Sequence, residues 1–335
     1  MENHKNILLD SHGRDHAYLR ISLIERCNLR CTYCMPEEGV SLSPKSHLMT
    51  YEEIYKIAKT FSDHGVTKIR LTGGEPLIRK DLPVILEKLA TLPVELSITS
   101  NAVIIDKFID VLKANGVNKI NVSLDSLDEG KFKHITRRNE FKKVYNNILL
   151  LVKEGFTVKV NAVLMKGFND NEIIDFINFT KDLPISVRFI EFMPFDGNKW
   201  DMGKMVSYAE VMKYVNEAFE NENFERLQDA PNDTAKNYKI KDYKGTFAII
   251  SSVTNPFCDS CNRLRLTANG QLKNCLFSSG ESDILTTLRA GKSIEPIIRK
   301  AVQAKFKVRG GMDTLKKLKE PKLHNNNRSM ITIGG

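Results

Sequence analysis

The segment 20–34 reads RISLIERCNLRCTYC, and it places three cysteines at the spacing C-x3-C-x2-C directly after an apolar run. Thiols at this spacing can converge on one side of a loop that caps a strand, where three of them suit an iron–sulfur cluster with one iron left open. A structural zinc site normally takes four protein ligands, so Cys27, Cys31 and Cys34 indicate a centre that also binds something from outside the chain. The alternative is buried free cysteines, but three thiols this close in sequence are too dense for ordinary core packing.

Length and composition describe a globular protein of a reducing compartment. The 335 residues are enough for one large barrel and an appended domain, and 41% of them are hydrophobic and 27% charged. The start Met1-Glu2-Asn3-His4-Lys5 is polar and no segment is long and apolar enough to cross a bilayer, so neither a secretory signal nor a membrane partner is expected. All six cysteines fall into two groups, which favours metal ligation over disulfides and predicts a cytoplasmic location.

The net charge of +9 leaves three classes of partner open: nucleic acid, a membrane surface or a small polyanion. Lysine and arginine are spread along the chain, and no RNA-binding motif with interleaved aromatic residues stands out, so a phosphorylated small molecule fits better and no nucleic acid is expected. The one dense basic stretch is interpreted mostly as a solvated face, and it comprises Lys305, Lys307, Arg309, Lys316, Lys317, Lys319 and Lys322.

The chain alternates short β-branched runs with helical patterns, which is typical of a parallel sheet covered by helices. Strands are expected to begin near Leu19, Lys68, Val94, Asn118, Thr157 and Ile185. Capping boxes are expected at Thr50/Glu53 and Ser207/Glu210, and further N-caps at Asp81, Asp106 and Asp170. Six β-α units are too few for a closed eight-stranded barrel, so the predicted fold class is α/β with an open, partial (βα)6 TIM-like barrel.

A composition shift after the sixth strand predicts a second domain. Asp229-Ala230-Pro231-Asn232-Asp233 has the composition of an exposed linker, and short strands and helices follow it. The predicted division is a barrel domain over residues 1–228 and a C-terminal α+β domain over residues 229–335.

Polar segments cluster where the expected strands end, and parallel strands present these ends at one mouth, where barrel enzymes keep their sites. The segments are Leu71-Thr72-Gly73-Gly74-Glu75-Pro76, Thr99-Ser100-Asn101, Ser123-Leu124-Asp125, Lys159 with Asn161, and Glu191-Phe192-Met193-Pro194. Gly73-Gly74 could be only a tight turn, but adjacent glycines also let the backbone approach a ligand, and Glu75 could bind an amino group. Ser123 and Met193 have plain alternatives as a turn residue and a core residue.

A second cysteine group, Cys258-x2-Cys261-x13-Cys275, lies on an expected hairpin that pivots on the two-residue turn Asn269-Gly270. Arg263 and Arg265 lie two residues apart on one strand and therefore project to the same face, whereas Leu264 projects to the other. Two fork-shaped cations beside a metal centre are well matched to the oxygens of a polyphosphate. A zinc ribbon whose fourth ligand lies elsewhere is the alternative.

Taken together, the motifs resemble those of a known enzyme family. Cys27-x3-Cys31-x-Tyr33-Cys34 looks like the signature of the radical S-adenosylmethionine (SAM) enzymes, in which the open iron of a 4Fe-4S cluster chelates SAM. Further segments make nearly the whole chain similar to the GTP 3′,8-cyclase family of molybdenum cofactor biosynthesis: Arg20-Ile21-Ser22, 69–76, 121–125, 188–194, 257–265 and Ile333-Gly334-Gly335. Thr99-Ser100-Asn101-Ala102 departs from the family's Thr-Thr-Asn-Gly, and Asn327-Arg328-Ser329-Met330 is looser than the family's tail.

This resemblance implies a radical reaction on GTP with two 4Fe-4S clusters and SAM as cofactors. The cluster on Cys27, Cys31 and Cys34 would release a 5′-deoxyadenosyl radical that takes hydrogen from C3′ of GTP, and the resulting carbon radical would attack C8 of guanine. Tyr33, Gly74, Ser123 and Met193 would line the SAM site, and the GTP contacts would be Arg20, Arg70, Thr99, Lys159, Arg263, Leu264 and Arg265. The second cluster, on Cys258, Cys261 and Cys275, would bind the guanine edge, with Arg263 and Arg265 taking part in catalysis.

The implied enzyme is a lyase that needs a reductant for its clusters and passes its product, (8S)-3′,8-cyclo-7,8-dihydroguanosine 5′-triphosphate, to a cyclic pyranopterin monophosphate synthase. A homodimer or a monomer is expected. Two alternatives stay open. One is a peptide-modifying radical SAM enzyme with an auxiliary cluster, and the other is a zinc-dependent nucleic-acid-binding protein, supported only by the net charge and Cys258-x2-Cys261.

Overall fold

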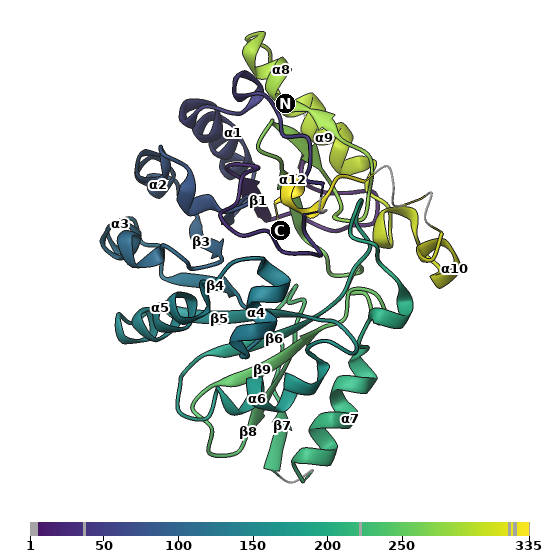
Figure 1. Cartoon of the computed structure of the whole chain (residues 1–335). Coiled ribbons are helices and arrows are strands. Elements are labelled where there is room, and N and C mark those ends of the chain that lie inside the picture. Colours follow the sequence, from purple (N-terminus) through teal and green to yellow (C-terminus); the bar gives the residue numbers. More distant parts are fainter. Residues whose placement is uncertain (1–5, 36–37, 221–222, 321–322, 324–326, 335) are drawn as a thin grey trace.

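One twelve-stranded sheet organises the chain, which a computed structural model describes over residues 6–35, 38–220, 223–320, 323 and 327–334. Six parallel strands occupy its centre in chain order: β1 (Tyr18–Ser22), β2 (Lys68–Thr72), β3 (Glu95–Ser100), β4 (Lys119–Ser123), β5 (Thr157–Leu164) and β6 (Ser186–Glu191). Each begins within one residue of the position expected from the sequence. The predicted α/β class with a partial barrel is confirmed, and the strands curve with helices on their outer side (Figure 1).

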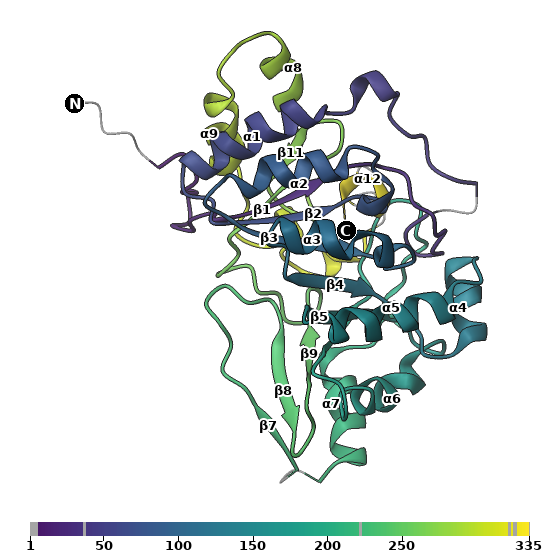
Figure 2. The same ribbon diagram turned by 90° about the vertical axis from the view of Figure 1, so that its left-hand side faces the viewer.

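Helices follow the strands as crossover connections, which parallel pairing requires. They are α1 (Tyr51–Asp63), α2 (Leu82–Ala90), α3 (Ile109–Ala114), α4 (Glu129–Thr136), α5 (Phe141–Lys153), α6 (Ile173–Asn178) and α7 (Tyr208–Ala218). Figure 2 shows α1, α2, α3 and α5 side by side over the outer face of the sheet. A helix-covered parallel sheet buries the apolar side chains of its outer face, and this leaves the inner face for polar chemistry.

The expected helix starts are confirmed only in part. Both capping boxes are present: Thr50 caps α1 together with Glu53, and Ser207 caps α7 in the same way. Asp81 occupies the N-cap of α2 but makes no side-chain cap bond. The N-caps expected at Asp106 and Asp170 are wrong, because both residues lie inside 3-10 turns that precede α3 and α6 and so displace the start of the helix.

Strand β5 shows how the sequence separates the core from the site. Val158, Val160 and Leu164 point to the apolar core, and each is at most 1% exposed. The alternate residues Lys159 and Asn161 line the cavity on the inner face. The two-residue period of a strand therefore decides which side chains can meet a ligand.

The C-terminal segment extends the central sheet on both edges. Its strands are β7 (Phe224–Arg226), β8 (Lys236–Ile240), β9 (Thr246–Ile250), β10 (Arg263–Leu266), β11 (Gln271–Lys273) and β12 (Ser282–Asp283), and its helices are α8 (Ile284–Arg289), α9 (Glu295–Gln303), α10 (Leu315–Leu318) and α12 (Met330–Ile333). β9 pairs parallel with β6, and β10 pairs parallel with β1. The second cysteine group is thereby carried next to the first strand, while the division at residues 228 and 229 stays a prediction.

The hairpin between β10 and β11 differs from the expected two-residue turn. The Thr267 amide donates to the Gln271 carbonyl at 2.9 Å, so the loop consists of the three residues 268–270. Gly270 has φ +72°, and a Cβ there would overlap the side chain of Leu285. Glycine is needed at the left-handed position of this three-residue loop, and the sequence signal Asn-Gly does not by itself distinguish it from the shorter turn.

Candidate active site

One cavity of about 580 Å³ runs along the inner face of the central strands, from their first residues to their carboxyl ends, and collects nearly all of the predicted site residues. Those that line it are Arg20, Cys27, Cys31, Tyr33, Cys34, Arg70, Gly74, Thr99, Ser123, Lys159, Met193, Cys258, Cys261, Arg263, Arg265 and Cys275. Leu264 is the exception, because its side chain is fully buried in the apolar core. Only the main chain of Leu264 could therefore contact a substrate, and this contact stays a prediction.

The loop after β1 carries the first cysteine set, Cys27, Cys31 and Cys34, and the end of α4 supports it. The amide of Arg30 donates to the Thr136 carbonyl at 3.0 Å, and the amide of Thr32 donates to the Ile135 carbonyl at 2.9 Å. These main-chain bonds fix the loop on both sides of Cys31, so the orientation of the thiols is set by the backbone.

Burial raises the pKa of every thiol in the first cysteine set: to about 11 for Cys27, to about 12 for Cys34 and well above the ordinary value for Cys31. Repulsion from Asp125 and from the neighbouring thiols adds to the effect at Cys31. Thiols in such surroundings ionise only when a metal centre compensates their charge, so their arrangement fits cluster ligation better than free thiolates.

Gly73 and Gly74 fold the end of β2 against the segment that leads into the first cysteine set. The Gly74 amide donates to the Ile24 carbonyl at 2.6 Å, and a Cβ on Gly74 would overlap the carbonyl of Arg26. The close backbone approach expected from two adjacent glycines is therefore an approach to the protein's own chain, although Gly74 also lines the cavity.

Glu75 joins the ends of two strands. Its carboxylate accepts hydrogen bonds from the Leu77 amide at 3.1 Å, the Ser100 hydroxyl at 2.8 Å and the Asn101 amide at 2.7 Å. The side chain is fully buried, and burial raises its pKa to about 7. Glu75 thereby ties the end of β2 to the end of β3. It also lines the cavity, and its contact with an amino group stays a prediction.

The residues predicted to hold SAM line the same cavity as the first cysteine set. The Tyr33 hydroxyl donates to Asp125 Oδ2 at 3.0 Å, and the Val163 amide donates to the other oxygen of Asp125 at 2.9 Å. Burial raises the pKa of Asp125 to about 6. Ser123 at the end of β4 and Met193 beyond β6 line the same cavity, so the four predicted SAM contacts share one chamber.

The second cysteine set, Cys258, Cys261 and Cys275, has cationic surroundings. The Lys305 ammonium donates to Cys261 Sγ at 3.4 Å. Burial opposes ionisation of Cys261, but Lys305 and Arg263 outweigh it and lower the pKa of this thiol to about 6. Most of the basic stretch is exposed as expected, but Lys305 and Arg309 are buried, at only 3% and 6% exposed, and Lys322 lies outside the described residues.

Both sets fit a polynuclear cluster in their donor chemistry. Within the described ranges, no group of three or more His, Cys, Asp or Glu side chains is close enough to hold a single metal ion. A four-iron cluster distributes its thiolate ligands over separate irons, so its ligands do not have to meet at one point. Each set supplies three thiols, which leaves one iron of such a cluster for a ligand from outside the chain.

The register of the sheet builds two rows of charged side chains in the cavity. Arg20 on β1 is paired with Arg70 on β2 and with Arg265 on β10. Two residues earlier, Tyr18 is paired with Lys68 and Arg263 in the same way. Although burial opposes it, Arg20 and Arg70 lower the pKa of Tyr18. Parallel pairing thus gathers cations from three strands that are far apart in sequence.

Several buried polar atoms in this cavity have no hydrogen-bond partner among the described residues. They are Tyr18 OH, Arg20 Nε, Asn121 Oδ1, Asn161 Oδ1, Arg188 Nε, Arg263 Nη2 and Asn274 Oδ1. A buried polar group without a partner costs about 1–3 kcal/mol, and such groups are rare in native proteins unless something binds them. Their convergence with the cation rows indicates a ligand that is both polar and anionic.

The C-terminal tail reaches into the same region. Arg265 Nη1 donates to the Gly334 carbonyl at 2.8 Å, and both groups are buried. Gly334 has φ +81°, and a Cβ there would lie 2.6 Å from Thr72 Oγ1 and 2.8 Å from the Ser22 Cβ. Only glycine fits between β1 and β2 at this point. Gly335 lies outside the described residues.

The sequence analysis missed several cavity residues. Tyr18, Lys68, Lys119 and Arg188 were not predicted as site residues, and a register argument across the parallel strands could have found them, because each lies on the inner face near a predicted contact. The segment 229–233 was expected to be only an exposed linker. Residues 230–234 also line the cavity, and nothing in their composition signals this placement.

Comparisons with known proteins agree with this architecture. The Radical SAM superfamily matches residues 21–180, and Molybdenum Cofactor Synthesis C matches residues 185–310. The GTP 3′,8-cyclase, mitochondrial, of Arabidopsis thaliana is 46% identical over 98% of this chain and 84% of its own length. Molybdenum cofactor biosynthesis protein 1 of Mus musculus is also 46% identical over 98% of the chain, but the chain spans only 51% of that relative.

A solved structure shares the fold. Streptococcus suis SuiB bound to S-adenosylmethionine aligns with a TM-score of 0.62 over 88% of this chain and 70% of that protein, at 16% sequence identity. At this identity the likeness concerns the fold alone.

Proposed function

The chain belongs to the GTP 3′,8-cyclase family of radical SAM enzymes, and from this premise we propose that it cyclises GTP to (8S)-3′,8-cyclo-7,8-dihydroguanosine 5′-triphosphate, in the first step of molybdenum cofactor biosynthesis. The observation that carries the proposal is the single cavity, because both cysteine sets, the predicted SAM contacts and the cation rows all line it. A substrate bound there meets a redox centre, a radical source and a phosphate-binding surface at once.

The cofactors would be SAM and two 4Fe-4S clusters, one on each cysteine set. SAM bound at a reduced cluster supplies one-electron chemistry that removes a hydrogen atom from the ribose. The protein's own contribution is to hold Cys27, Cys31 and Cys34 on a backbone-fixed loop and to keep Tyr33, Gly74, Ser123 and Met193 around them.

Binding of GTP would rest on the cation rows. Arg20, Arg70, Arg263 and Arg265 present guanidinium groups whose geometry suits phosphate oxygens, and Lys159 adds an ammonium. Thr99 lines the cavity as a further candidate contact. The unpartnered nitrogens Arg20 Nε and Arg263 Nη2 would find acceptors on the triphosphate. The second cysteine set would meet the guanine edge while these residues hold the phosphates.

The proposed reaction also implies partners and a compartment. A reductant must supply electrons, and a cyclic pyranopterin monophosphate synthase would consume the product. The protein would act as a monomer or a homodimer in a reducing compartment such as the cytoplasm, since all six cysteines are free. Among the described residues, no helix has the length and hydropathy of a membrane span.

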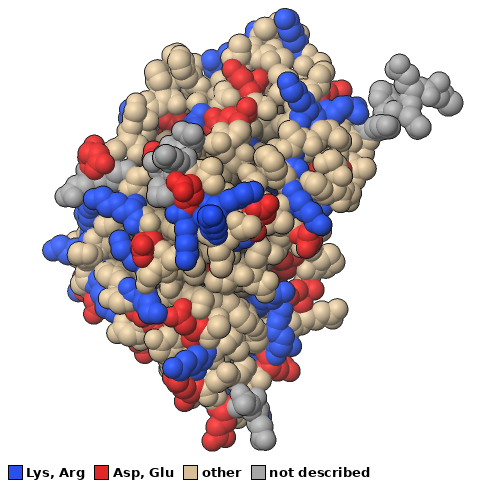
Figure 3. All heavy atoms as spheres, turned by 90° about the vertical axis from the view of Figure 1, so that its right-hand side faces the viewer, with Lys and Arg blue, Asp and Glu red and all other residues tan. Residues whose placement is uncertain are grey.

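The charge distribution on the face seen in Figure 3 does not favour a nucleic-acid partner. There Lys and Arg are interspersed with Asp and Glu over the whole height of the molecule, and they do not form one continuous basic surface. Proteins that bind nucleic acid by charge usually present clustered cations. The basic residues predicted to contact GTP, namely Arg20, Arg70, Lys159, Arg263 and Arg265, instead line the cavity.

The test is anaerobic incubation of the reconstituted protein with SAM, a reductant and GTP, followed by mass analysis of the products. We expect 5′-deoxyadenosine together with a cyclised nucleotide of the same mass as GTP. Guanosine and ATP serve as matched controls, and neither should be converted efficiently. SAM cleavage without any change in GTP, but with modification of a peptide substrate, would contradict the proposal in favour of the peptide-modifying alternative.

A further inference from the structure

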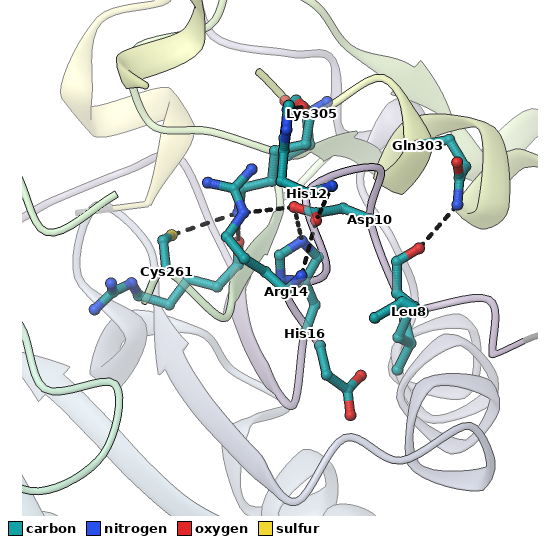
Figure 4. Close-up of polar contacts among 12 residues, drawn as sticks. Leu8, Asp10, His12, Arg14, His16, Cys261, Gln303 and Lys305 are labelled. Carbon is teal, nitrogen blue, oxygen red and sulfur yellow. Dashed lines mark hydrogen bonds and ion pairs between the residues drawn. The ribbon is translucent and has the colours of Figure 1, made fainter. Parts of the chain in front are cut away.

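An N-terminal clasp, which we define as residues 8–16, packs against the second cysteine set, outside the cavity (Figure 4). A bridge between Leu9 and Asp15 closes it into a hairpin-like turn. At its centre Asp10 accepts hydrogen bonds from the amides of His12 and Arg14 at 2.9 Å and from Arg14 Nε at 2.6 Å. The clasp is therefore a rigid, internally bonded unit.

Arg14 connects the clasp to two other segments. Its guanidinium donates to the Cys258 carbonyl at 2.8 Å, to the Phe306 carbonyl at 2.9 Å and to the Lys307 carbonyl at 2.9 Å. One buried side chain thus joins the start of the second cysteine loop to the segment after α9. His12 Nε2 lies 3.1 Å from the Lys305 carbonyl, so the same clasp also fixes the backbone of Lys305.

His16 completes the clasp as a neutral group. It is fully buried, with Nε2 3.3 Å from Asp10 Oδ2. Although this distance is that of an ion pair, burial and the charges of Lys305 and Arg14 lower the pKa of His16 to about 3, so the imidazole carries no charge. The negative charge of Asp10 is therefore opposed chiefly by Arg14, with which it forms the short ion pair.

Lys305 is the unusual member of this group. It is 3% exposed, and its ammonium donates to the Arg263 carbonyl at 2.9 Å and to Cys261 Sγ at 3.4 Å. Throughout the described ranges no carboxylate lies within ion-pair distance of it. A buried ammonium without an anionic partner is costly, so the one sulfur in contact with it is the group that can supply the negative charge.

We propose that Lys305 is a positioning residue of the second cysteine set: held in place by the N-terminal clasp, it donates to Cys261 Sγ and raises the reduction potential of the cluster on that set. The inference rests on the proposed function in one respect, that this set holds an iron–sulfur cluster. Reduction adds negative charge to a cluster, and a cation or hydrogen-bond donor at a ligating sulfur stabilises the reduced form. No atom of Lys305 has to touch the substrate for this effect.

The experiment compares Lys305→Met with Lys307→Met in the reconstituted full chain. Methionine keeps a similar length without charge or donor, and Lys307 is an exposed lysine of the same segment. Iron content and a potentiometric titration followed by electron paramagnetic resonance are measured for both clusters. We expect Lys305→Met to keep both clusters and to lower the potential of the second one alone, by at least about tenfold in the reduction equilibrium, or about 59 mV for one electron.

Three outcomes would overturn the inference: an unchanged second potential with full iron content, an equal shift in Lys307→Met, or a shift of both clusters together. Loss of about half the iron in Lys305→Met would also overturn it, because the residue would then be needed for holding the cluster and not for tuning it. If Lys305→Met does not fold, Lys305→Gln and Lys305→Arg decide the matter. Arginine should retain the potential and glutamine should lower it, and equal potentials in the two variants would refute the role of charge.

Failure of the proposed function looks different from failure of this inference. A parent protein that contains zinc, or only one cluster, would show that the second cysteine set holds no iron–sulfur cluster, before any variant is made. A parent with two clusters whose second potential ignores Lys305 would leave the cyclase proposal intact and remove this inference alone.

Discussion

The two cysteine sets supply the same number of thiols but differ in the electrostatic surroundings of Cys261, whereas burial raises the pKa of Cys258 as it does in the first set. Around the first set, burial and the carboxylates of Asp125 and Glu75 raise the thiol pKa values. Around Cys261 of the second set, Lys305 and Arg263 outweigh burial and lower the thiol pKa to about 6. Carboxylates resist the addition of an electron to a nearby cluster, whereas cations favour it. Clusters of one type would therefore be a stronger reductant at the first set than at the second.

The largest effect is expected from a change in the first cysteine set. Cys31→Ser should abolish 5′-deoxyadenosine formation and remove about half of the iron, because its cluster is the one that would reduce SAM. The measurement is SAM cleavage with and without GTP, beside iron analysis. SAM cleavage by Cys31→Ser at the parent rate would show that the first set is not the radical source.

The matching change in the second cysteine set separates the two roles. Cys275→Ser should also lose about half of the iron and make no cyclised product, but it should still form some 5′-deoxyadenosine, uncoupled from GTP. Melting of the variant is measured alongside, because loss of a structural zinc ligand would destabilise the fold and release zinc with the iron unchanged. Normal product formation would exclude this set from handling GTP.

Substitution of one cation tests whether the cation rows bind the triphosphate. Arg265→Ala should weaken GTP binding about tenfold to a hundredfold, since a hydrogen bond to a charged group contributes about 1.5–3 kcal/mol. Equilibrium binding of GTP and of guanosine is compared, and the loss should be smaller for guanosine, which lacks phosphates. Arg299→Ala, on an exposed face of α9, is the control. Equal losses for both ligands would assign Arg265 a structural role through its bond to the Gly334 carbonyl.

The tail can be tested with a single methyl group. Gly334→Ala places a Cβ against Thr72 and Ser22 and adds the strain of a positive φ, which costs about 1–2 kcal/mol, so cyclisation should fall about tenfold while both clusters are retained. Gly291→Ala is a matched control, because Gly291 has φ +70° but open space around it. If both variants lose activity equally, backbone strain and not the fit of the tail is responsible.

The sequence was sufficient for those features that depend on local periodicity. The start of each of the six central strands was placed within one residue, because short β-branched runs are local signals, and Gly65, Gly116 and Gly155 mark the ends of the helices before β2, β4 and β5. The same-face placement of Arg263 and Arg265 also follows from a two-residue period, and both line the cavity. Most other site residues were predicted from the resemblance to a family and not from the pattern of residues along the chain.

Features that depend on long-range pairing could not be predicted in this way. The pairing of β10 with β1 brings Arg265 beside Arg20, although 245 residues separate them in the sequence. No local signal in either strand announces this pairing. Lys305 looked like part of a solvated basic stretch, because its burial depends on the N-terminal clasp at the other end of the chain. Asp106 and Asp170 failed as N-caps because 3-10 turns, which have weak sequence signals, precede the helices.

The smallest expected effect is a pH dependence of GTP affinity. Burial, together with the nearby Arg188 and Arg70, lowers the pKa of Lys159 to about 8 in the free protein. A bound triphosphate favours the protonated ammonium, so it raises this pKa, and affinity should be full below pH 8 and fall by at most about tenfold for each unit above it. Binding is measured between pH 7 and pH 9.5 in the parent and in Lys159→Met. The variant should bind more weakly and lack the decline near pH 8, because its side chain does not titrate. A decline of the same size in the variant would assign the pH dependence to another group, such as Tyr18, whose hydroxyl faces the same cations.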